Sequence, residues 1–220
     1  MKRSKPFFLI LTCALMLFVL SASIAVPLLC RPFYYAHMAL LELSAQTPWS
    51  AAEIRAAFDE MMDFCIFGTP FGTGVLRWSE SGMSHFADCA KLFRLDFLVL
   101  ALSALTLLVC FFLRRRGLRP FRPLGRGSAF WAGSVLALAF LVIGVLAALN
   151  FNAAFVVVHR LFFPGKDNWL FDPAADQIIL ILPQIFFRNC AILIVALLFL
   201  GCAALIVWDL RHDGRLRKKR

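Results

Sequence analysis

The stretch FLVLALSALTLLVCFFLRRR, residues 97–116, decides the fold of this chain. Its first 17 residues carry no charge, and three consecutive arginines follow them. A helix rises about 1.5 Å per residue, so this run, led in by Leu92, Phe93 and Leu95, is long enough to cross a hydrocarbon core roughly 30 Å thick. An uncharged run that ends in a basic cluster is typical of a membrane span stopping at the cytoplasmic surface.

Three further uncharged, apolar runs have a similar length: residues 7–29, 129–149 and 191–208. Of the 220 residues, 61% are hydrophobic and 16% are charged, whereas soluble domains have about 45–50% and about 25%. This composition excludes disordered and disulfide-stapled secreted chains and disfavours a water-soluble enzyme. The run 7–29 exceeds the apolar region of a cleaved signal peptide, so we expect a retained anchor. We predict an all-α integral membrane protein with four transmembrane helices in a single membrane domain, residues 1–220.

The net charge of +10 is unevenly distributed along the chain. Fifteen of the 23 Lys and Arg residues, with only two acids, lie in the N-terminal segment, the connection between the second and third spans, and the tail. The two remaining segments hold eight basic and 11 acidic residues. Because positive charge is retained on the cytoplasmic side, we predict that both termini are cytoplasmic and that residues 30–96 and 150–190 form a mostly helical extracytoplasmic cap. We interpret the basic clusters as signals that set the orientation of the spans and as contacts for anionic lipid. We expect no nucleic-acid partner.

The first cap segment contains two predicted helices. Ser50 and Glu53 form a capping-box pattern, and apolar residues then recur at helical spacing up to the breaker residues 68–74. A second helix is expected over residues 81–94, running into the second span.

In the second cap segment, we expect the third span to continue as helix as far as Arg160. Asp172 followed by Pro173 has the pattern of a helix start, so we expect another helix from there towards Pro183.

Histidine is the first candidate for chemistry in the cap, because its ordinary pKa near 6.5 lets it exchange protons at neutral pH. His85 lies three residues before Asp88, so the two share a helix face and the carboxylate could orient the ring. His159 lies beyond the third span. One such histidine is more often an interfacial hydrogen-bonding residue than a catalyst, but two histidines that must converge above one bundle make the interfacial and the catalytic interpretations about equally well supported. His37, beside two tyrosines, is expected to be structural.

The residue spacings give little support to a metal site or to a site with reactive cysteines. No His-x-x-His, Glu-x-x-His or Cys-x-x-Cys pattern occurs, so we expect no metal site and no cofactor. The paired reactive cysteines of a quinone-linked disulfide oxidase are missing. A structural bridge between Cys65 and Cys89 remains open at this stage.

Two runs of residues resemble a known family. The first is ESGMSHFAD, residues 80–88, and the second and more specific is HRLFFPGKDNWLFDP, residues 159–173, which continues to Phe186 and Phe187. Together with the four spans and the cap, they look like the bacterial lipoprotein intramolecular transacylases, the Lit family. The resemblance covers nearly the whole chain. Gln184 departs from it, because an acidic residue is expected there.

The resemblance implies a specific reaction and site. Family members act on a lipoprotein whose N-terminal cysteine carries a diacylglyceryl group, and they move the sn-2 acyl chain to the α-amine without a cofactor. Two histidines act together, and they match His85 and His159 here. Substrate-binding or orienting roles are expected for the remaining polar site residues: Asp88, Arg160, Asn168, Trp169 and Asp176.

The expected enzyme is thus an acyltransferase of the bacterial cell membrane that spans it several times, acts as a monomer and has its active site on the extracytoplasmic side. Its partners are the diacylglyceryl-modified lipoprotein substrate and membrane lipid. Two alternatives stay open from the sequence: a non-catalytic four-span scaffold and an acyltransferase that uses free phospholipid.

Overall fold

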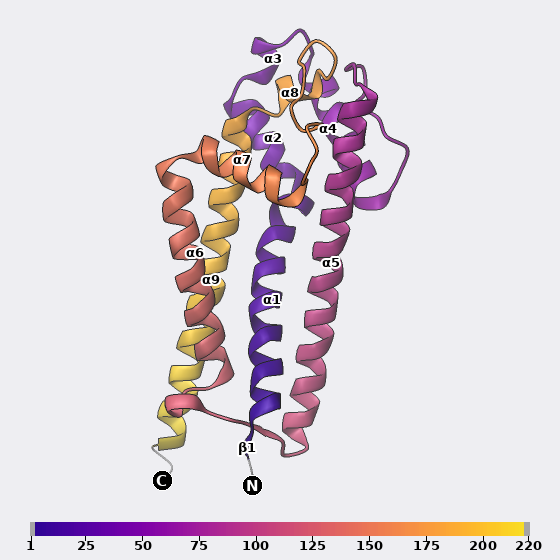
Figure 1. The fold of residues 1–220 in the computed structure, drawn as a ribbon. Helices are drawn as coiled ribbons and strands as arrows, with labels where there is room; N and C mark the ends of the chain where they lie inside the picture. Colours follow the sequence, from indigo (N-terminus) through magenta and orange to yellow (C-terminus); the bar gives the residue numbers. More distant parts are fainter. Residues whose placement is uncertain (1–2, 218–220) are drawn as a thin grey trace. The chain divides into compact units, whose positions relative to one another are not determined.

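The computed structural model describes residues 3–217 and is almost entirely helical (Figure 1). The long helices are α1 (Lys5–Leu29), α4 (Ala51–Phe67), α5 (Glu80–Arg115), α6 (Ser128–Leu149), α7 (Phe151–Phe162) and α9 (Gln184–Arg217). The short elements are α2 (Arg31–Leu40), α3 (Leu43–Gln46), α8 (Ile178–Ile181), the strands β1 (Arg3–Ser4) and β2 (Arg119–Pro120), and the 3-10 turn η1 (Pro123–Gly125).

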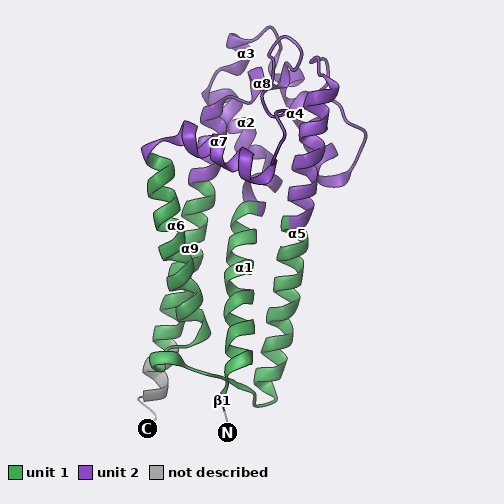
Figure 2. Cartoon of the chain, in the orientation of Figure 1, with its two compact units in different colours: residues 1–24, 96–148, 193–220 green, residues 25–95, 149–192 purple. Residues whose placement is uncertain are grey.

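Four of these helices are long and apolar enough to cross a membrane: α1, α5, α6 and α9. Each contains one of the four runs identified in the sequence, so the four-helix membrane fold is confirmed. The chain divides into two compact units, shown in green and purple in Figure 2. Unit 1 comprises residues 1–24, 96–148 and 193–220, and unit 2 comprises residues 25–95 and 149–192.

Unit 1 contains the uncharged parts of the four long helices. At one end of this bundle, β1 pairs with β2 in parallel register, and the backbone N–H of Gly127 donates to Asp209 Oδ2 at 3.1 Å. The N-terminal segment, the arginine-rich connection and the last part of α9 therefore lie at the same end (Figure 1). This arrangement agrees with the prediction that all three basic segments face one side. Most of the basic tail lies outside the residues whose side chains are described.

Unit 2 has an aromatic and aliphatic core. Tyr34 is 1% exposed, stacks on Phe58 with ring centroids 3.6 Å apart, and donates its hydroxyl to the Ile181 carbonyl at 2.9 Å. The core therefore joins α2, α4 and the segment around α8. The capping box of Ser50 and Glu53 starts α4 as predicted, and the helix ends at Gly68, whose φ of 76° suits a residue without Cβ.

The structure corrects two expectations about the second cap segment. The third span does not continue to Arg160 as one helix, because the chain breaks at Asn150, whose side chain accepts from Ala153 N and caps the separate helix α7. No helix begins at Asp172. Its carboxylate accepts from Ala174 N at 2.9 Å in a turn, and only the four residues of α8 are helical before α9.

Candidate active site

His85 and His159 lie side by side in unit 2, although 74 positions separate them in the sequence. Their ring centroids are 5.8 Å apart and the ring planes differ by 27°. His85 comes from the N-terminal third of α5 and His159 from the last turn of α7. Both residues precede or follow the uncharged runs of their neighbouring spans, so they lie outside the segments expected to cross the membrane.

The start of α5 is held by the second cap segment. Asp176 accepts the backbone N–H and the hydroxyl of Ser79, each at 2.8 Å, while the Ser79 hydroxyl accepts the N–H of Gly82 at 3.0 Å. Gly82 fits because a Cβ there would lie 2.1 Å from the Asp176 carboxylate. These bonds fix the first turn of α5 and with it the height of His85 along the helix.

The ring of His159 is held by a backbone bond and by aromatic contacts. Its Nδ1 lies 2.7 Å from the carbonyl oxygen of Phe155, one turn earlier on α7. The ring also packs against Phe155 at 4.1 Å and Trp169 at 4.8 Å between centroids. Because a carbonyl oxygen can only accept, Nδ1 carries a proton and the neutral ring has its lone pair on Nε2.

His85 is 5% exposed and lies among aromatic rings. Its centroid is 4.9 Å from that of Phe163 and 5.4 Å from that of Phe171. Burial, and next the neighbouring His159, lower the pKa of His85 from 6.5 to about 4, while Asp88 acts in the opposite direction. His85 is therefore neutral at neutral pH.

The buried carboxylate of Asp88 binds lysines rather than a histidine. Asp88 Oδ2 accepts from Lys166 and, at 3.3 Å, from Asn168 Nδ2, while Oδ1 accepts from Lys91 at 3.0 Å. The hydrogen bond from Lys166 is the largest of the causes that lower the pKa of this carboxyl. Among the described residues Asp88 makes no hydrogen bond to the His85 ring: it ties the segment after α7 to α5, and its charge favours the protonated form of His85.

The other predicted site residues have distinct environments. Trp169 contacts His159 through its ring and donates Nε1–H to the Lys166 carbonyl at 2.9 Å. Asn168 donates to Asp88 and, at 3.4 Å, to Ser84. Asp176 bonds Ser79 at the start of α5 and, among the described residues, makes no hydrogen bond to a histidine ring, so it acts on His85 through the first turn of α5. Arg160 lies exposed on α7.

The sequence reading missed two kinds of residue around the paired rings. Lys166 lies inside the family-like run, but no spacing rule pairs it with Asp88. Phe163 and Phe171 enclose His85, and no sequence pattern assigned them to the site. Cys89, whose position four residues after His85 brings it within reach on a helix, lies 3.5 Å from His85 Nε2 through its Sγ.

Other features of unit 2 lie apart from the paired rings. No cluster of three or more potential metal ligands occurs among residues 3–211, whose side chains the structure describes. His37 is hydrogen-bonded at both ring nitrogens: Nδ1 bonds the Phe33 carbonyl and Nε2 bonds the Asn189 side-chain amide. These bonds fit its expected structural role. Cys65 and Cys89 are free thiols.

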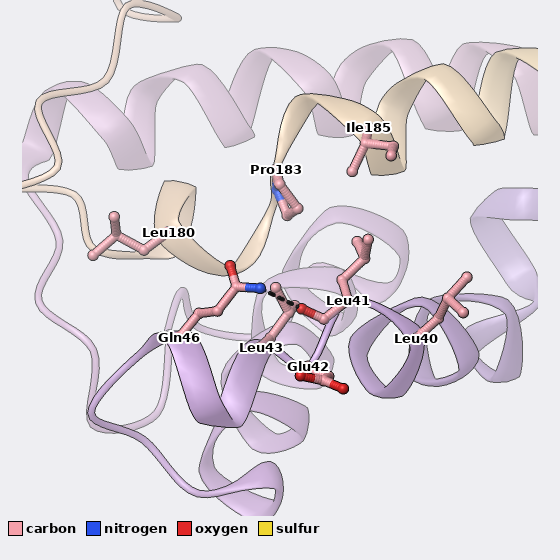
Figure 3. A pocket seen from close by; sticks show the side chains of 8 residues that line it. All are labelled: Leu40, Leu41, Glu42, Leu43, Gln46, Leu180, Pro183 and Ile185. Carbon is pink, nitrogen blue, oxygen red and sulfur yellow. Dashed lines mark hydrogen bonds between the residues drawn. The ribbon is translucent and has the colours of Figure 1, made fainter.

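Unit 2 also contains a groove of about 350 Å³ (Figure 3). It is lined by residues 40–43, Gln46 and residues near Pro183, and neither catalytic candidate lies in it.

Comparison with known proteins identifies one matching family and one similar fold. Residues 9–187 match the family model of the lipoprotein intramolecular transacylase Lit. The membrane integral Lit from Bacillus cereus is similar in structure, with a TM-score of 0.82 at 21% identity over 97% of each chain. A variant of that protein with a histidine replaced by arginine matches at a TM-score of 0.78 and 19% identity, over 97% of this chain and 93% of that one. No curated protein sequence matches the chain.

Proposed function

The chain belongs to the lipoprotein intramolecular transacylase Lit family, and we propose that it moves the sn-2 acyl chain of a diacylglyceryl-modified N-terminal cysteine to the α-amine of the same residue. The product is the lyso-form lipoprotein, with one chain on nitrogen and one on glycerol. The enzyme is an acyltransferase, as its family is. The observation that carries the proposed catalytic site is the pair of neighbouring histidine rings, 5.8 Å apart.

The chemistry needs little more than proton transfer and positioning. An α-amine with an ordinary pKa near 8 must lose a proton to attack the ester, and the departing glycerol oxygen must gain one. Imidazoles perform both tasks near neutral pH. Because the amine and the ester belong to one substrate, holding them in reacting geometry removes much of the entropic barrier, and no acyl-enzyme is needed.

The surroundings of the rings suit a lipid substrate. Phe163 and Phe171 against His85, and Phe155 and Trp169 against His159, form an apolar wall that excludes water and accepts acyl chain. We propose that the protein acts as a monomer. The asymmetry of Lys and Arg supports a location in the bacterial cell membrane with this site on the extracytoplasmic side.

The direct test is incubation of the purified protein with a synthetic diacylglyceryl lipopeptide. We expect a product of unchanged mass whose fragmentation spectrum places one acyl chain on the terminal nitrogen. Release of free fatty acid would contradict the proposal. Added phospholipid carrying a distinct chain tests the acyltransferase alternative, and the appearance of that chain on the amine would favour it.

A further inference from the structure

The two histidines are held by different bonds, and these bonds leave different nitrogens available. His159 gives its Nδ1–H to the Phe155 carbonyl, so its Nε2 lone pair is available to receive a proton. His85 instead has its Nε2 next to a thiol, the Sγ of Cys89, at 3.5 Å. Cys89 follows His85 by four residues on α5, so the same helical turn fixes both side chains.

The direction of the bond between Cys89 and His85 follows from the strengths of the two groups. Sulfur is a weak acceptor, whereas the unprotonated nitrogen of imidazole is a good one, so the thiol donates S–H to Nε2. Burial raises the pKa of the Cys89 thiol to about 12, which keeps its proton in place. With Nε2 accepting, the single proton of the neutral His85 ring is on Nδ1.

His85 Nδ1 has no hydrogen-bond partner among the residues whose side chains the structure describes. Among the buried side-chain nitrogen and oxygen atoms of the described residues, three lack a partner, and the other two are oxygens, on Asp96 and Asn168. Two other candidate donors of the site are already used, because Trp169 Nε1–H bonds the Lys166 carbonyl and the Asn168 amide bonds Asp88. A buried N–H without a protein partner is unusual in a native protein and calls for a specific explanation, such as a role towards a substrate.

The reaction creates the acceptor that such a donor fits. When the amine attacks the ester carbonyl, its oxygen becomes a tetrahedral oxyanion, which N–H donors in a dry site stabilise more strongly than they stabilise the starting ester. A neutral imidazole is a poor source of a whole proton but a good hydrogen-bond donor, so the neutral His85 suits this task better than acid catalysis.

We propose, resting on the proposed function, that His159 carries the proton while His85, held in its Nδ1–H tautomer by Cys89, donates a hydrogen bond to the oxyanion. The N–C bond forms as the amine proton passes to His159 Nε2. The C–O bond then breaks as His159 returns that proton to the glycerol oxygen. His85 neither gains nor loses a proton, and Cys89 is a positioning residue.

The tautomer is measured directly by nitrogen NMR of protein labelled with ¹⁵N-histidine in lipid nanodiscs, without substrate. The resonances are assigned with His85→Asn and His159→Asn. We expect a protonated Nδ1 and an unprotonated Nε2 in His85, kept in Cys89→Ser and lost in Cys89→Ala. Cys190→Ala, which removes a half-buried thiol packed on the same core, is the matched control and should change neither ring. A wild-type His85 protonated on Nε2 would overturn the assignment.

Activity separates the oxyanion role from proton transfer. The side-chain amide of His85→Asn retains an N–H donor but cannot titrate, so we expect its kcat to exceed that of His85→Ala by about tenfold, whereas His159→Asn should be as inactive as His159→Ala. Cys89→Ala should lower kcat about three- to tenfold without changing KM, and Cys89→Ser should restore it.

Equal inactivity of folded His85→Asn and His85→Ala would mean that His85 must transfer a proton, which contradicts the proposal. A wild-type protein without transacylase activity would overturn the proposed function and the oxyanion role with it. The tautomer would still be decided by the NMR spectrum alone.

Discussion

At the scale of single residues, the site depends on what surrounds two imidazoles. His85 is almost fully buried among phenylalanines, and His159 is fixed through the Phe155 carbonyl and the Trp169 ring. The environment of His85 favours a neutral ring, and that of His159 leaves Nε2 available to accept a proton. The division of tasks between two residues of the same type follows from these differences.

Replacing either histidine by alanine should remove most of the activity. General acid–base catalysis and oxyanion stabilisation are each worth about 10²- to 10⁴-fold, so we expect His85→Ala and His159→Ala to fall by at least 10²-fold in kcat/KM. The measurement is the rate of N-acylated product formation on lipopeptide. His37→Ala, which alters a histidine held in the same unit, should remain active. Full activity of folded His85→Ala or His159→Ala would rule out this site.

The low pKa of His85 should make stability depend on pH. A histidine whose pKa is about 4 when folded and near 6.5 when unfolded stabilises the fold above pH 6.5, and this contribution is lost as the pH falls towards 4. The loss should be about 3 kcal/mol at most. The lowered pKa of Asp88 acts only below pH 4, outside this window. Thermal unfolding in detergent between pH 7.5 and 4.5 measures the effect, and His85→Asn should flatten the curve; an equally steep curve for this variant would contradict the assignment.

At the scale of elements, the site is assembled by the segment that follows α7. This segment is bound to α5 twice, through Lys166 and Asn168 to Asp88 and through Asp176 to Ser79. Between these two attachments it carries Trp169 and Phe171, which contact the histidines. The acids next to the site therefore act as ties: they place the aromatic rings, and Asp176 also fixes the turn of α5 that carries His85.

Loss of the Asp176 tie should destabilise this part of the protein. Asp176→Ala leaves the Ser79 N–H without its buried acceptor and removes a charge-assisted bond, which together cost about 2–3 kcal/mol. A lower Tm and slower transacylation are expected. Asp172→Ala, from the same segment, removes only a bond to Ala174 in an exposed turn and should change the Tm little. Equal effects of the two substitutions would show that Asp176 is not a tie.

Local patterns in the sequence predicted some elements and not others, for physical reasons. The α4 helix was predictable because its cap, apolar face and terminating Gly68 all lie within the helix or beside it. The helix expected at Asp172 did not form, because Gln177 instead exchanges bonds with the Arg77 backbone, a partner 100 residues away. The separate α7 was missed because apolar residues resume after Asn150 and Asn152 and extend the pattern of the span, so that the cap at Asn150 was not recognised. The convergence of the two histidines and the nearness of Cys89 to His85 could be expected, whereas the contact of Lys166 with Asp88, across 78 positions, requires coordinates.

At the scale of the whole molecule, the uncharged runs and the residues of the candidate site lie in different parts of the chain. The uncharged runs of α1, α5, α6 and α9 belong mainly to unit 1, and every residue of the candidate site belongs to unit 2. The net charge of +10 combines an excess of 13 positive charges in the segments predicted to be cytoplasmic with an excess of three negative charges elsewhere. The basicity of the chain therefore indicates topology and not its substrate.

The predicted topology can be tested with reporter fusions. Because Lys and Arg are retained in the cytoplasm, we expect a fluorescent protein to be active at either terminus and alkaline phosphatase to be inactive there. Phosphatase inserted in the loop between Gly68 and Ser79 should be active. Active phosphatase at the C-terminus would contradict the assigned orientation and place the site on the other side.

The central claim is that the acyl chain moves within one molecule of substrate. The most direct measurement is a crossover experiment in which the purified enzyme receives two lipopeptides at once, one with a deuterated sn-2 chain and a distinct peptide sequence, the other unlabelled. Fragmentation mass spectrometry then reads the label on each N-terminal amine. We predict that the deuterated chain is found only on the amine of the peptide that carried it; deuterium on the amine of the unlabelled peptide would contradict the claim.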